Sequence, residues 1–424
     1  MRAALAAVDA GGLVRTALAT TPDVIRTVQS AAAIDVVAVG KAARPMVLAL
    51  PVALPRAAFR HVHAISNQPA EGLPSGVQWH VTAHPVPDSR SVGAARAALA
   101  VAAAAEDRDL LLVLMSGGAS AMMALPADRI SLDDKRRTSQ QLLDAGAEVH
   151  ALNAVRKHLS GVKGGQLAAA TRGSTLTLAV SDVVGNEPTA IGSGPTVGDS
   201  TTFADALEVL ERYGGRRAYP AAVVQRLIAG ARGAHPETPK PGDARLARSF
   251  VHVIGSARTA VDGARAVVES LGYRVHVVDE PVIGAARAAG QTLIETAARL
   301  AAPAAGGTPL CVLAAGETTV RVTGSGLGGR NQECALGMVR GLNTFGRQAI
   351  AASVGTDGVD GPTNAAGAIA DTTTLSRAMT AGLETPERHL DNNDSYRFFD
   401  RLGDLILTGP TNTNVGDLQV ILIG

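Results

Sequence analysis

Cysteine and aromatic residues are scarce in this sequence of 424 residues. Its two cysteines, Cys311 and Cys334, are too few for a disulfide framework or a zinc site of several cysteines, so we expect buried free thiols in a reducing compartment. Aromatic residues make up 3 % of the chain and apolar residues 46 %, so Ala, Val and Leu must fill the core. This composition suits helices that pack closely on parallel strands.

The sequence also lacks a charge excess and a long apolar run. It has 39 Lys and Arg against 38 Asp and Glu, whereas nucleic-acid binders usually show a basic excess. No apolar run reaches the roughly 18–20 residues of a membrane-spanning helix. The first 20 residues, interrupted by Asp9 and two glycines, predict a short amphipathic helix rather than a signal peptide. We expect no nucleic-acid partner, no membrane association and a cytoplasmic location.

Three common catalytic motifs are missing. There is no G-x-x-x-x-G-K-[ST], which argues against a Walker-type kinase, and no G-x-S-x-G, which argues against a serine hydrolase. The ten histidines include no H-E-x-x-H spacing, so no zinc site is expected. A small anionic substrate stays compatible with the neutral composition, because it needs only a few local cations.

Apolar runs alternate with glycine turns and helical segments along the chain. The runs that predict strands are 34–39, 110–115, 176–180, 250–254, 309–314 and 350–354. Because these runs are continuously apolar, we expect strands covered on both faces, in parallel sheets with right-handed crossovers. The length favours two α/β domains. A stretch rich in Pro and Gly at 230–247 predicts an interdomain linker or a long surface excursion, and it places the domains at 1–235 and 246–424.

A glycine turn flanked by serines follows the predicted strand 110–115. Its residues are Ser116, Gly117, Gly118, Ala119 and Ser120. Ligands bind at the carboxyl ends of strands in open parallel sheets, and a helix N-terminus after a glycine turn attracts anions. The segment therefore predicts a phosphate or carboxylate site, or alternatively a tight strand-to-helix turn capped by serine.

Two cations stand at comparable positions. Lys41 follows the strand 34–39, where a buried lysine needs an anion, although it could also be solvated at the start of a helix. Arg330 ends a glycine-rich loop, 324–329, that satisfies only a weak G-x-G-x-x-G pattern. Its guanidinium could brace a transferring phosphoryl group or grip a carboxylate, or it could lie exposed in the loop of a hairpin at 317–323.

Three acidic residues follow predicted strands, namely Asp182, Glu317 and Asp357. Phosphoryl transfer uses carboxylates to hold Mg²⁺ and to accept a hydroxyl proton, and these residues are the candidates, although each could instead cap a helix or a turn. The segment 153–165 predicts an anion site or a solvated basic helix.

Taken together, these segments resemble the glycerate 2-kinase family, whose C-terminal portion is called the MOFRL domain. The matching motifs are VGKAARPM at 39–46, AHPVPDSRSV at 83–92, SGGASAMM at 116–123, NAVRKHLSGVKGGQLA at 153–168, SDVVGNEPTAIGSGPTVGDSTTF at 181–203, AAGETTVRVTGSGLGGRNQECAL at 314–336 and GTDGVDGPTNAAGAI at 355–369. They cover most of the chain in order. Gly198 stands where the family pattern leads us to expect proline.

The resemblance implies two three-layer α/β domains, the N-terminal one Rossmann-like, with an active-site cleft between them. It implies ATP, Mg²⁺ and D-glycerate phosphorylated at the 2-hydroxyl, and it makes Lys41 and Arg330 the catalytic residues. Our further assignment of residues to the nucleotide comprises Ser116, Gly117, Gly118, Ser120, Lys163, Gly164, Asp182, Asn186, Glu317 and Asp357, with Asp182 and Glu317 also as metal ligands.

Two rival functions stay open at this point, and so does a homodimer. Some family members are named hydroxypyruvate reductases, which keeps an NAD(P)H-dependent reductase as an alternative. A sensor that binds an anionic metabolite without catalysis is the other.

Overall fold

The computed structural model describes residues 1–57, 59–301 and 309–424. They divide into two compact units, which we call the first unit (residues 10–254) and the second unit (residues 1–9 and 255–424). Residues 1–9 belong to the second unit because α1 (Arg2–Ala7) packs on α12 (Ala257–Ser270) and the carbonyl of Val8 accepts a hydrogen bond from Thr413, at 2.7 Å. The domain bounds 1–235 and 246–424 stay a prediction beside this division.

The first unit is built on a six-stranded sheet in the order β3-β2-β1-β4-β5-β6. Its strands are β1 (Ile34–Val39), β2 (Phe59–Ser66), β3 (Val77–Val81), β4 (Leu110–Met115), β5 (Ser174–Val180) and β6 (Ser249–Gly255). The strand β1 pairs in parallel with β2 and β4, so that Val36 stands between Val62 and Leu112. The predicted strands 34–39 and 110–115 are confirmed as β1 and β4.

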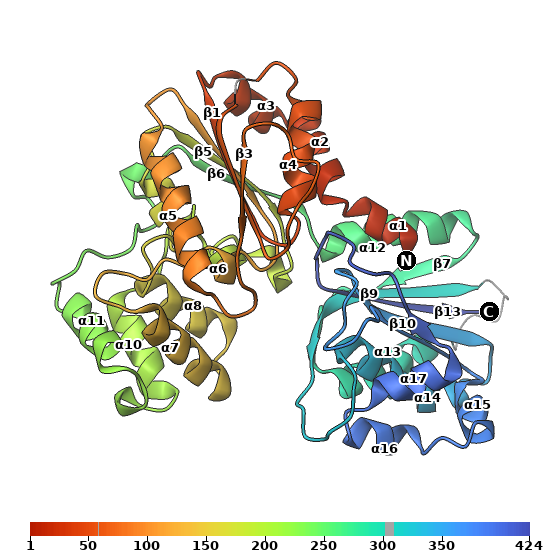
Figure 1. The fold of residues 1–424 in the computed structure, drawn as a ribbon. Coiled ribbons are helices and arrows are strands. Elements are labelled where there is room, and N and C mark those ends of the chain that lie inside the picture. Colours follow the sequence, from red (N-terminus) through yellow and green to blue (C-terminus); the bar gives the residue numbers. More distant parts are fainter. Residues whose placement is uncertain (58, 302–308) are drawn as a thin grey trace. The chain divides into compact units, whose positions relative to one another are not determined.

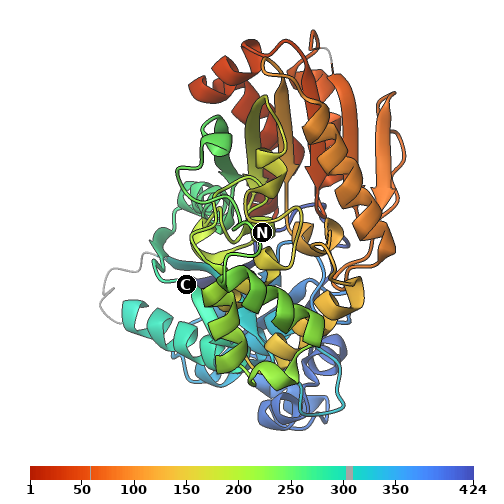
Figure 2. The ribbon, with the colours of Figure 1, turned by 90° about the vertical axis from the view of Figure 1, so that its left-hand side faces the viewer.

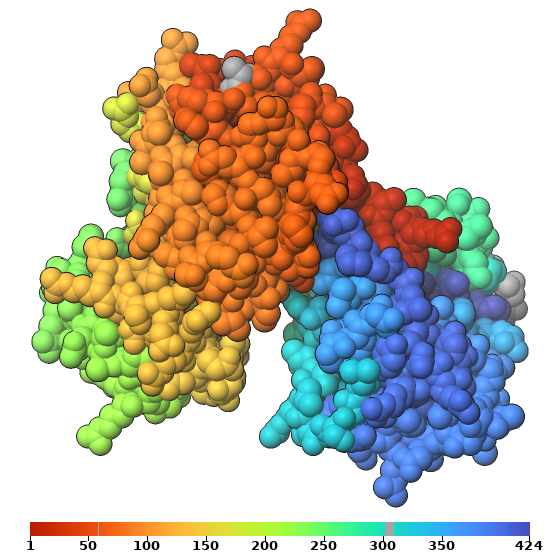
Figure 3. Space-filling view, in the orientation of Figure 1, coloured from red at the N-terminus to blue at the C-terminus, as the bar shows by residue number. Residues whose placement is uncertain are grey.

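Helices cover both faces of this sheet (Figure 1). They are α2 (Ala10–Thr20), α3 (Pro22–Gln29), α4 (Ala43–Ala53), α5 (Ser89–Ala104), α6 (Ala119–Met122), α7 (Leu132–Asp144), α8 (Val149–His158), α9 (Gln166–Ala169), α10 (Phe203–Arg212) and α11 (Ala221–Ala231). The helix α5 packs Ala94 and Ala98 against Val37 and Val39 of β1. The helices α2 to α4 lie on the opposite face. The edge strand β3 belongs to the orange surface that faces the viewer in Figure 3.

The helices α7, α8, α10 and α11 form a helical group at one end of the sheet (Figures 1 and 2). Their shared core contains Leu142, Val155, Phe203 and Leu227. The helix α10 is capped by Thr202, which exchanges hydrogen bonds with Asp205 in a capping box.

The stretch 230–247 is a surface excursion of the first unit. Thr238 donates to the buried carboxylate of Asp199 at 3.0 Å, and the amide of Asp199 donates to the carbonyl of Pro239 at 2.8 Å. A Cβ at Gly198 would lie 2.6 Å from the nitrogen of Pro241. Glycine at position 198, where the family motif leads us to expect proline, therefore has a physical reason: the excursion lies too close to this position to leave room for a side chain.

The second unit contains a mixed sheet in the order β12-β11-β10-β13-β9-β7, with β8 paired to β9. Its strands are β7 (Arg274–Val277), β8 (Val282–Ala285), β9 (Leu310–Thr319), β10 (Ala349–Gly355), β11 (Gly367–Asp371), β12 (Leu405–Ile406) and β13 (Asp417–Ile423). The prediction of parallel strands alone is wrong here, because β13 inserts antiparallel between β9 and β10. The prediction of a hairpin at 317–323 is also wrong, because Glu317 lies in β9 and pairs in parallel with Ile283 of β8.

Helices cover both faces of the second sheet as well (Figure 1). Besides α1 and α12 they are α13 (Ala286–Ala301), α14 (Arg330–Asn343), α15 (Thr374–Thr380), α16 (Pro386–Asp391) and α17 (Ser395–Leu402). The helices α13 and α14 meet at glycines: a Cβ at Gly290 would lie 2.1 Å from the carbonyl oxygen of Cys334, and one at Gly337 2.5 Å from that of Arg287. Within the described ranges, no helix has both the length and the apolar character needed to cross a bilayer.

These glycine contacts predict opposite effects of alanine at two helical sites. Gly290→Ala should lower the free energy of unfolding by about 1–3 kcal/mol, because the added methyl forces α13 away from α14 despite the better helix propensity of alanine. Apart from its own helix backbone and adjacent residues, no atom of the described chain lies within 4 Å of the Cβ position of Gly93 on α5, so Gly93→Ala should stabilise the protein by about 0.5–1 kcal/mol. Thermal unfolding of both variants measures the contrast, and an unchanged or raised midpoint for Gly290→Ala would contradict the packing argument.

Candidate functional site

The turns after β1 and β4 are joined directly. The amide of Lys41 donates to the carbonyl of Gly117 at 2.9 Å, and the amide of Ala42 donates to Oγ of Ser116 at 3.0 Å. Gly40 has a φ of 127°, and a Cβ there would lie 2.3 Å from Oγ of Ser116. Two segments that the sequence selected separately therefore form one structure, and glycine is required where they touch.

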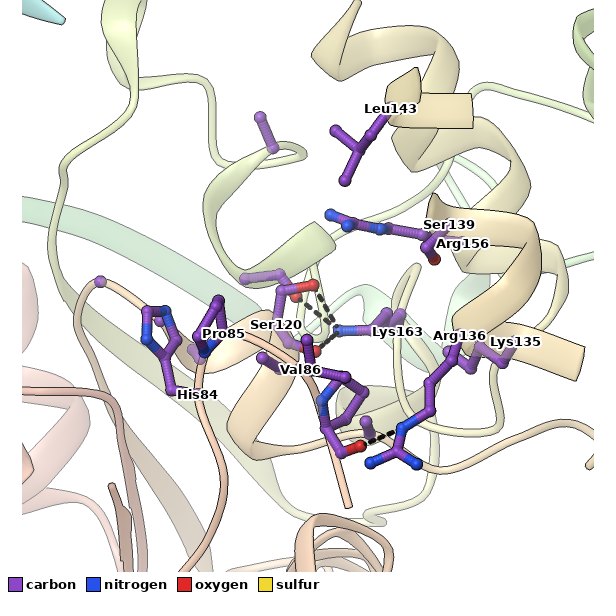
Figure 4. Close-up of a pocket in the computed structure, with 18 of the residues that line it drawn as sticks. His84, Pro85, Val86, Ser120, Lys135, Arg136, Ser139, Leu143, Arg156 and Lys163 are labelled. Carbon is purple, nitrogen blue, oxygen red and sulfur yellow. Dashed lines mark hydrogen bonds between the residues drawn. The ribbon is translucent and has the colours of Figure 1, made fainter. Parts of the chain in front are cut away.

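A cavity of about 280 Å³ lies within the first unit, next to these turns (Figure 4). The end of the sheet contributes 116–121 and Asp182, the helical group contributes Lys135, Arg136 and Arg156, and the loop 84–87 closes another side. Of the predicted nucleotide residues, the cavity is lined by Ser116, Gly117, Gly118, Ser120, Lys163 and Asp182. Lys41 lies beside the Ser116 turn and is outside this lining.

Lys163 is the most deeply buried of the cations, at 1 % exposure. Its ammonium donates to the carbonyl oxygen and Oγ of Ser120, at 2.8 and 2.9 Å, and to the carbonyl of Gly192 at 3.4 Å (Figure 4). Burial, and then the nearby positive charges of Lys135 and Arg156, place the pKa of Lys163 well below its usual value. Because three protein acceptors surround this ammonium, its main effect is to hold Ser120 in place.

Ser120 is also held by polar contacts with Ser193 and, through it, with Asn153. Its Oγ lies 3.0 Å from Oγ of Ser193, which donates to Oδ1 of Asn153 at 2.9 Å. Gly164 contributes through its backbone, since its amide donates to the carbonyl of Ser193 at 3.1 Å and its φ is +57°. Gly164 thus shapes the wall behind the cavity instead of facing it.

The segment after β5 places its two predicted residues differently. Asp182 lines the cavity and is the only acidic residue among the described lining residues. Asn186 ends the 3₁₀ turn η1 (Val184–Asn186) with a φ of 54°, and its amide donates to the carbonyl of Val183 at 3.0 Å. The structure does not place Asn186 in the cavity lining.

Sequence reasoning missed Lys135 and Arg136, which line the cavity, and it assigned no individual role to Arg156 or to the loop 84–87, although these lie in the segment 153–165 and in the motif at 83–92. A signal for Lys135 existed, because it lies three and seven residues before Thr138 and Leu142, which are the other buried residues of α7. A lysine on the buried stripe of a helix is unusual and invites a search for its partner.

The second unit holds a different arrangement around Arg330, the first residue of α14. Its Nε and Nη2 donate to both oxygens of Asp417 at 2.8 and 2.9 Å, and its Nη1 lies 3.0 Å from Oε1 of Glu317. Burial alone would lower the pKa of Arg330, but the hydrogen bonds and charge of Asp417, followed by Glu317, raise it above the usual value. Arg330 is therefore held as a permanent cation between two carboxylates.

The N-terminus of α14 is capped by Asp360, another residue that the sequence analysis missed. Oδ1 and Oδ2 of Asp360 accept from the amides of Asn331 and Gln332 at 3.0 and 2.9 Å. Burial raises the pKa of Asp360 to about 6, against the effect of these two amides. Asn331 also donates to Oδ1 of Asp417 at 2.9 Å, which links the cap to the Arg330 pair.

Asp357 lies at the same edge of the second sheet. Its Oδ1 accepts from the amide of Val359 at 3.2 Å, so it stabilises the turn after β10. Oδ1 of Asp357 and Nδ2 of Asn331 both border the Cβ position of Gly355, at 3.3 and 3.4 Å. The structure thus places the predicted residues Arg330, Glu317 and Asp357 along one sheet edge.

The glycine loop 324–329 is packed against the chain at 392–394. Asn393 accepts from the amides of Thr323 and Gly324 at 2.7 and 3.0 Å, and Asp394 accepts from that of Leu327 at 2.9 Å. The close approach requires the glycines, since a Cβ at Gly324 would lie 2.3 Å from the carbonyl oxygen of Asn392. The amides of residues 323–327 are therefore already bound within the protein.

The metal assignment stays a prediction. Asp182 belongs to the first unit and Glu317 to the second. Among the residues that the structure describes, no group of three or more His, Cys, Asp or Glu side chains is placed to hold a metal ion. The convergence of Lys41 and Arg330, one from each unit, also stays a prediction.

Comparisons with known proteins bear on this pair of units. A family model described as a domain of unknown function (DUF4147) matches residues 1–228, and the model of the MOFRL family matches residues 310–417. The D-glycerate 2-kinase of Thermotoga maritima is 36 % identical over 395 residues, which are 91 % of this chain and 90 % of that protein. The chain belongs to the glycerate 2-kinase family.

Other relatives of this family member carry two kinds of name. The glycerate 2-kinase of Pyrococcus horikoshii is 37 % identical over 80 % of this chain and 76 % of its own length. A putative hydroxypyruvate reductase of Agrobacterium vitis is 37 % identical over 92 % of this chain and 87 % of its own length. The crystal structure of the Thermotoga maritima glycerate kinase matches with a TM-score of 0.85 and 33 % identity, over 100 % of this chain and 99 % of that one.

The Arg330 pair leads to a stability prediction. Asp417→Asn should lower the free energy of unfolding by about 1–3 kcal/mol, less than a fully buried pair would lose, because Arg330 is one-third exposed and keeps Glu317. The matched control is Asp262→Asn at the exposed pair with Arg258, where a change below about 0.5 kcal/mol is expected. Denaturant unfolding measures both, and equal effects of the two substitutions would contradict the structural role of Asp417.

Proposed function

We propose that this chain is a glycerate 2-kinase that transfers the terminal phosphoryl group of ATP to the 2-hydroxyl of D-glycerate. The observation that carries the proposal is the cavity at the carboxyl ends of β4 and β5 in a chain of this family, where several cations and, among the described lining residues, a single acidic residue meet. Such a cavity suits anionic substrates and matches the names of the kinase relatives.

The reaction requires one bond to form and one to break. The 2-hydroxyl oxygen of glycerate bonds to the γ-phosphorus, the bond from that phosphorus to the β,γ-bridging oxygen breaks, and the hydroxyl proton is released. Because the transition state spreads charge over the transferred phosphoryl oxygens, positioned cations lower its energy. We assign this role to Lys41 of the first unit and Arg330 of the second unit.

The remaining predicted residues have supporting roles in this proposal. The hydroxyls of Ser116 and Ser120 and the glycine turn between them hold nucleotide phosphate, with Lys163 and Gly164 fixing the turn. Asn186, Glu317 and Asp357 complete the nucleotide-binding assignment. Arg330 is well suited to its part because Asp417 holds the guanidinium in one orientation, so little reorganisation accompanies the reaction.

The residues present fit a magnesium ion that accompanies the nucleotide. Mg²⁺ in kinases is usually held by one or two carboxylates together with phosphate oxygens, and Asp182 supplies a carboxylate in the lining of the cavity. Glu317 is the second proposed ligand, and its carboxylate lies against Arg330. The ion would neutralise part of the negative charge on the phosphate groups.

A reductase is the less favoured function. The names of two relatives suggest it, but in the G-x-G-x-x-G loop, which could have bound a dinucleotide, the amides of residues 324–327 are engaged by residues 392–394. We also infer a cytoplasmic enzyme, in keeping with ATP as substrate and with two buried free thiols. A homodimer stays open.

The first test is the reaction itself. Incubation with D-glycerate, ATP and Mg²⁺ should release ADP, and NMR of the product should show phosphorus coupled to the proton on carbon 2. Oxidation of NADH by hydroxypyruvate in the absence of ATP, without ADP release from glycerate, would establish the reductase instead.

The second test concerns the two catalytic cations. Lys41→Ala and Arg330→Ala should each lower kcat by about 100-fold or more, because each removes a charge that acts on the transferred group. The matched controls are Arg44→Ala, an exposed residue one turn along, and Arg340→Ala, an exposed residue on α14 paired with Glu387. Steady-state kinetics should show the controls near the unchanged protein. Near-normal kcat in both Lys41→Ala and Arg330→Ala would refute the assignment.

A further inference from the structure

Three cations from separate segments face one cavity in the first unit. Lys135 comes from α7, Arg156 from α8 and Lys163 from the loop before α9. In Figure 4 the side chain of Arg156 extends into the cavity between Leu143 and Lys163. Clustering like charges in a protein interior is costly unless an anion joins them.

The hydrogen bonds of these cations are unequally satisfied. Lys163 has three protein acceptors, as described above, whereas Lys135 is 4 % exposed and its ammonium donates to a single described acceptor, the carbonyl of Leu159, at 3.2 Å. Since an ammonium carries three donors, two of those on Lys135 lack a protein acceptor in the described chain. A ligand in the cavity, which Lys135 lines, could accept hydrogen bonds from these two donors.

Arg156 lacks a carboxylate partner as well. No Asp or Glu of the described residues lies within 4.0 Å of its guanidinium, although it is largely buried. Burial lowers the pKa of Arg156, and burial followed by the charge of Arg156 lowers that of Lys135 to about 7. Both side chains would be stabilised by an anion in the cavity.

The neighbouring polar groups indicate which anion fits. Nε of Arg136 donates a hydrogen bond to the carbonyl of Pro87 and so holds the loop 84–87 in place. Asp182 is the one acidic side chain in the described lining. Donors approach the cavity from α7, α8 and the Ser116–Ser120 turn, that is, from several directions. A tetrahedral phosphate accepts from several directions, whereas a carboxylate presents two oxygens in one plane. The glycine turn adds amides suited to phosphate.

We propose that Lys135 and Arg156 bind the phosphate chain of the nucleotide, as a subsite opposite the Ser116–Ser120 turn. This inference rests on the proposed kinase function for its ligand, but it gives a role to Lys135, which lies outside the motifs, and to Arg156, to which the motif at 153–168 gave no role of its own. The helical group α7–α8 then belongs to the nucleotide site.

Binding without turnover tests the subsite. Calorimetric titration with ADP and, separately, with pyrophosphate should show affinities at least about 10-fold weaker in Lys135→Met and in Arg156→Gln, because each loses a charge-assisted hydrogen bond. The matched control is Arg137→Gln, which removes an exposed charge from the same helix outside the cavity and should change affinity less than twofold.

Unfolding temperatures with and without ADP distinguish a binding role of Lys135 from a structural one. Lys135→Met keeps the shape of the side chain and removes a buried cation, so its unfolding temperature without ligand should equal or exceed that of the unchanged protein, while the rise with ADP should shrink. Should Lys135→Met fail to fold, Arg156→Gln carries the same test. Unchanged affinity for ADP and pyrophosphate in the folded variants, or an unchanged protein that binds neither, would overturn the subsite.

Steady-state kinetics distinguishes the two anionic substrates and the two hypotheses. The KM for ATP should rise in both variants while the KM for D-glycerate stays within about twofold; a rise for D-glycerate alone would assign the cavity to the carboxylate and overturn the proposal. Weaker ADP binding in the variants of a protein that phosphorylates no glycerate would uphold the subsite and refute the kinase function. Normal ADP binding in variants of an active kinase would refute the subsite and uphold the kinase function.

Discussion

The close contact between the turns after β1 and β4 is the constraint on which the first unit depends. Parallel pairing of these neighbouring strands sets their carboxyl ends side by side. The turns come so close that a Cβ at Gly40 would lie 2.3 Å from Oγ of Ser116, so only glycine fits there. Lys41 and the Ser116–Ser120 turn can then share hydrogen bonds. A side chain at position 40 would separate them and open the sheet at the edge where ligands bind.

Much of this edge could be predicted from the sequence, because the relevant signals are local. Continuous apolar runs predicted β1 and β4 with their observed bounds, and the polar residues that follow buried parallel strands must gather at one edge. Lys41 and Ser116 were therefore selected correctly as neighbours of the sheet end. Whether they act in catalysis is a separate question that geometry within one unit does not answer.

Tertiary packing hid the rest from sequence reasoning. Lys135 lies in the segment LDDKRRTSQQLLD, which looks like an ordinary solvated helix until Thr138 and Leu142 are seen on the same buried side. The partner of Arg330 lies 87 residues further along, at Asp417, and no local pattern connects them. The mixed second sheet was mispredicted for the same reason, because the last strand of the chain inserts between two earlier ones and no periodicity reveals that order.

The contrast between the cations of the two units has a physical meaning. Arg330 is compensated by Asp417 and Glu317, so keeping it charged costs little and its orientation is fixed before any substrate arrives. Lys135 and Arg156 have no such carboxylates within the described chain, so their burial stores an unfavourable electrostatic energy that an arriving anion can release. A compensated cation suits a catalytic role because its geometry is preorganised, and an uncompensated one suits binding because its partner is the ligand. A kinase needs both kinds of cation, since it must hold a polyanion and then stabilise charge that moves only in the transition state.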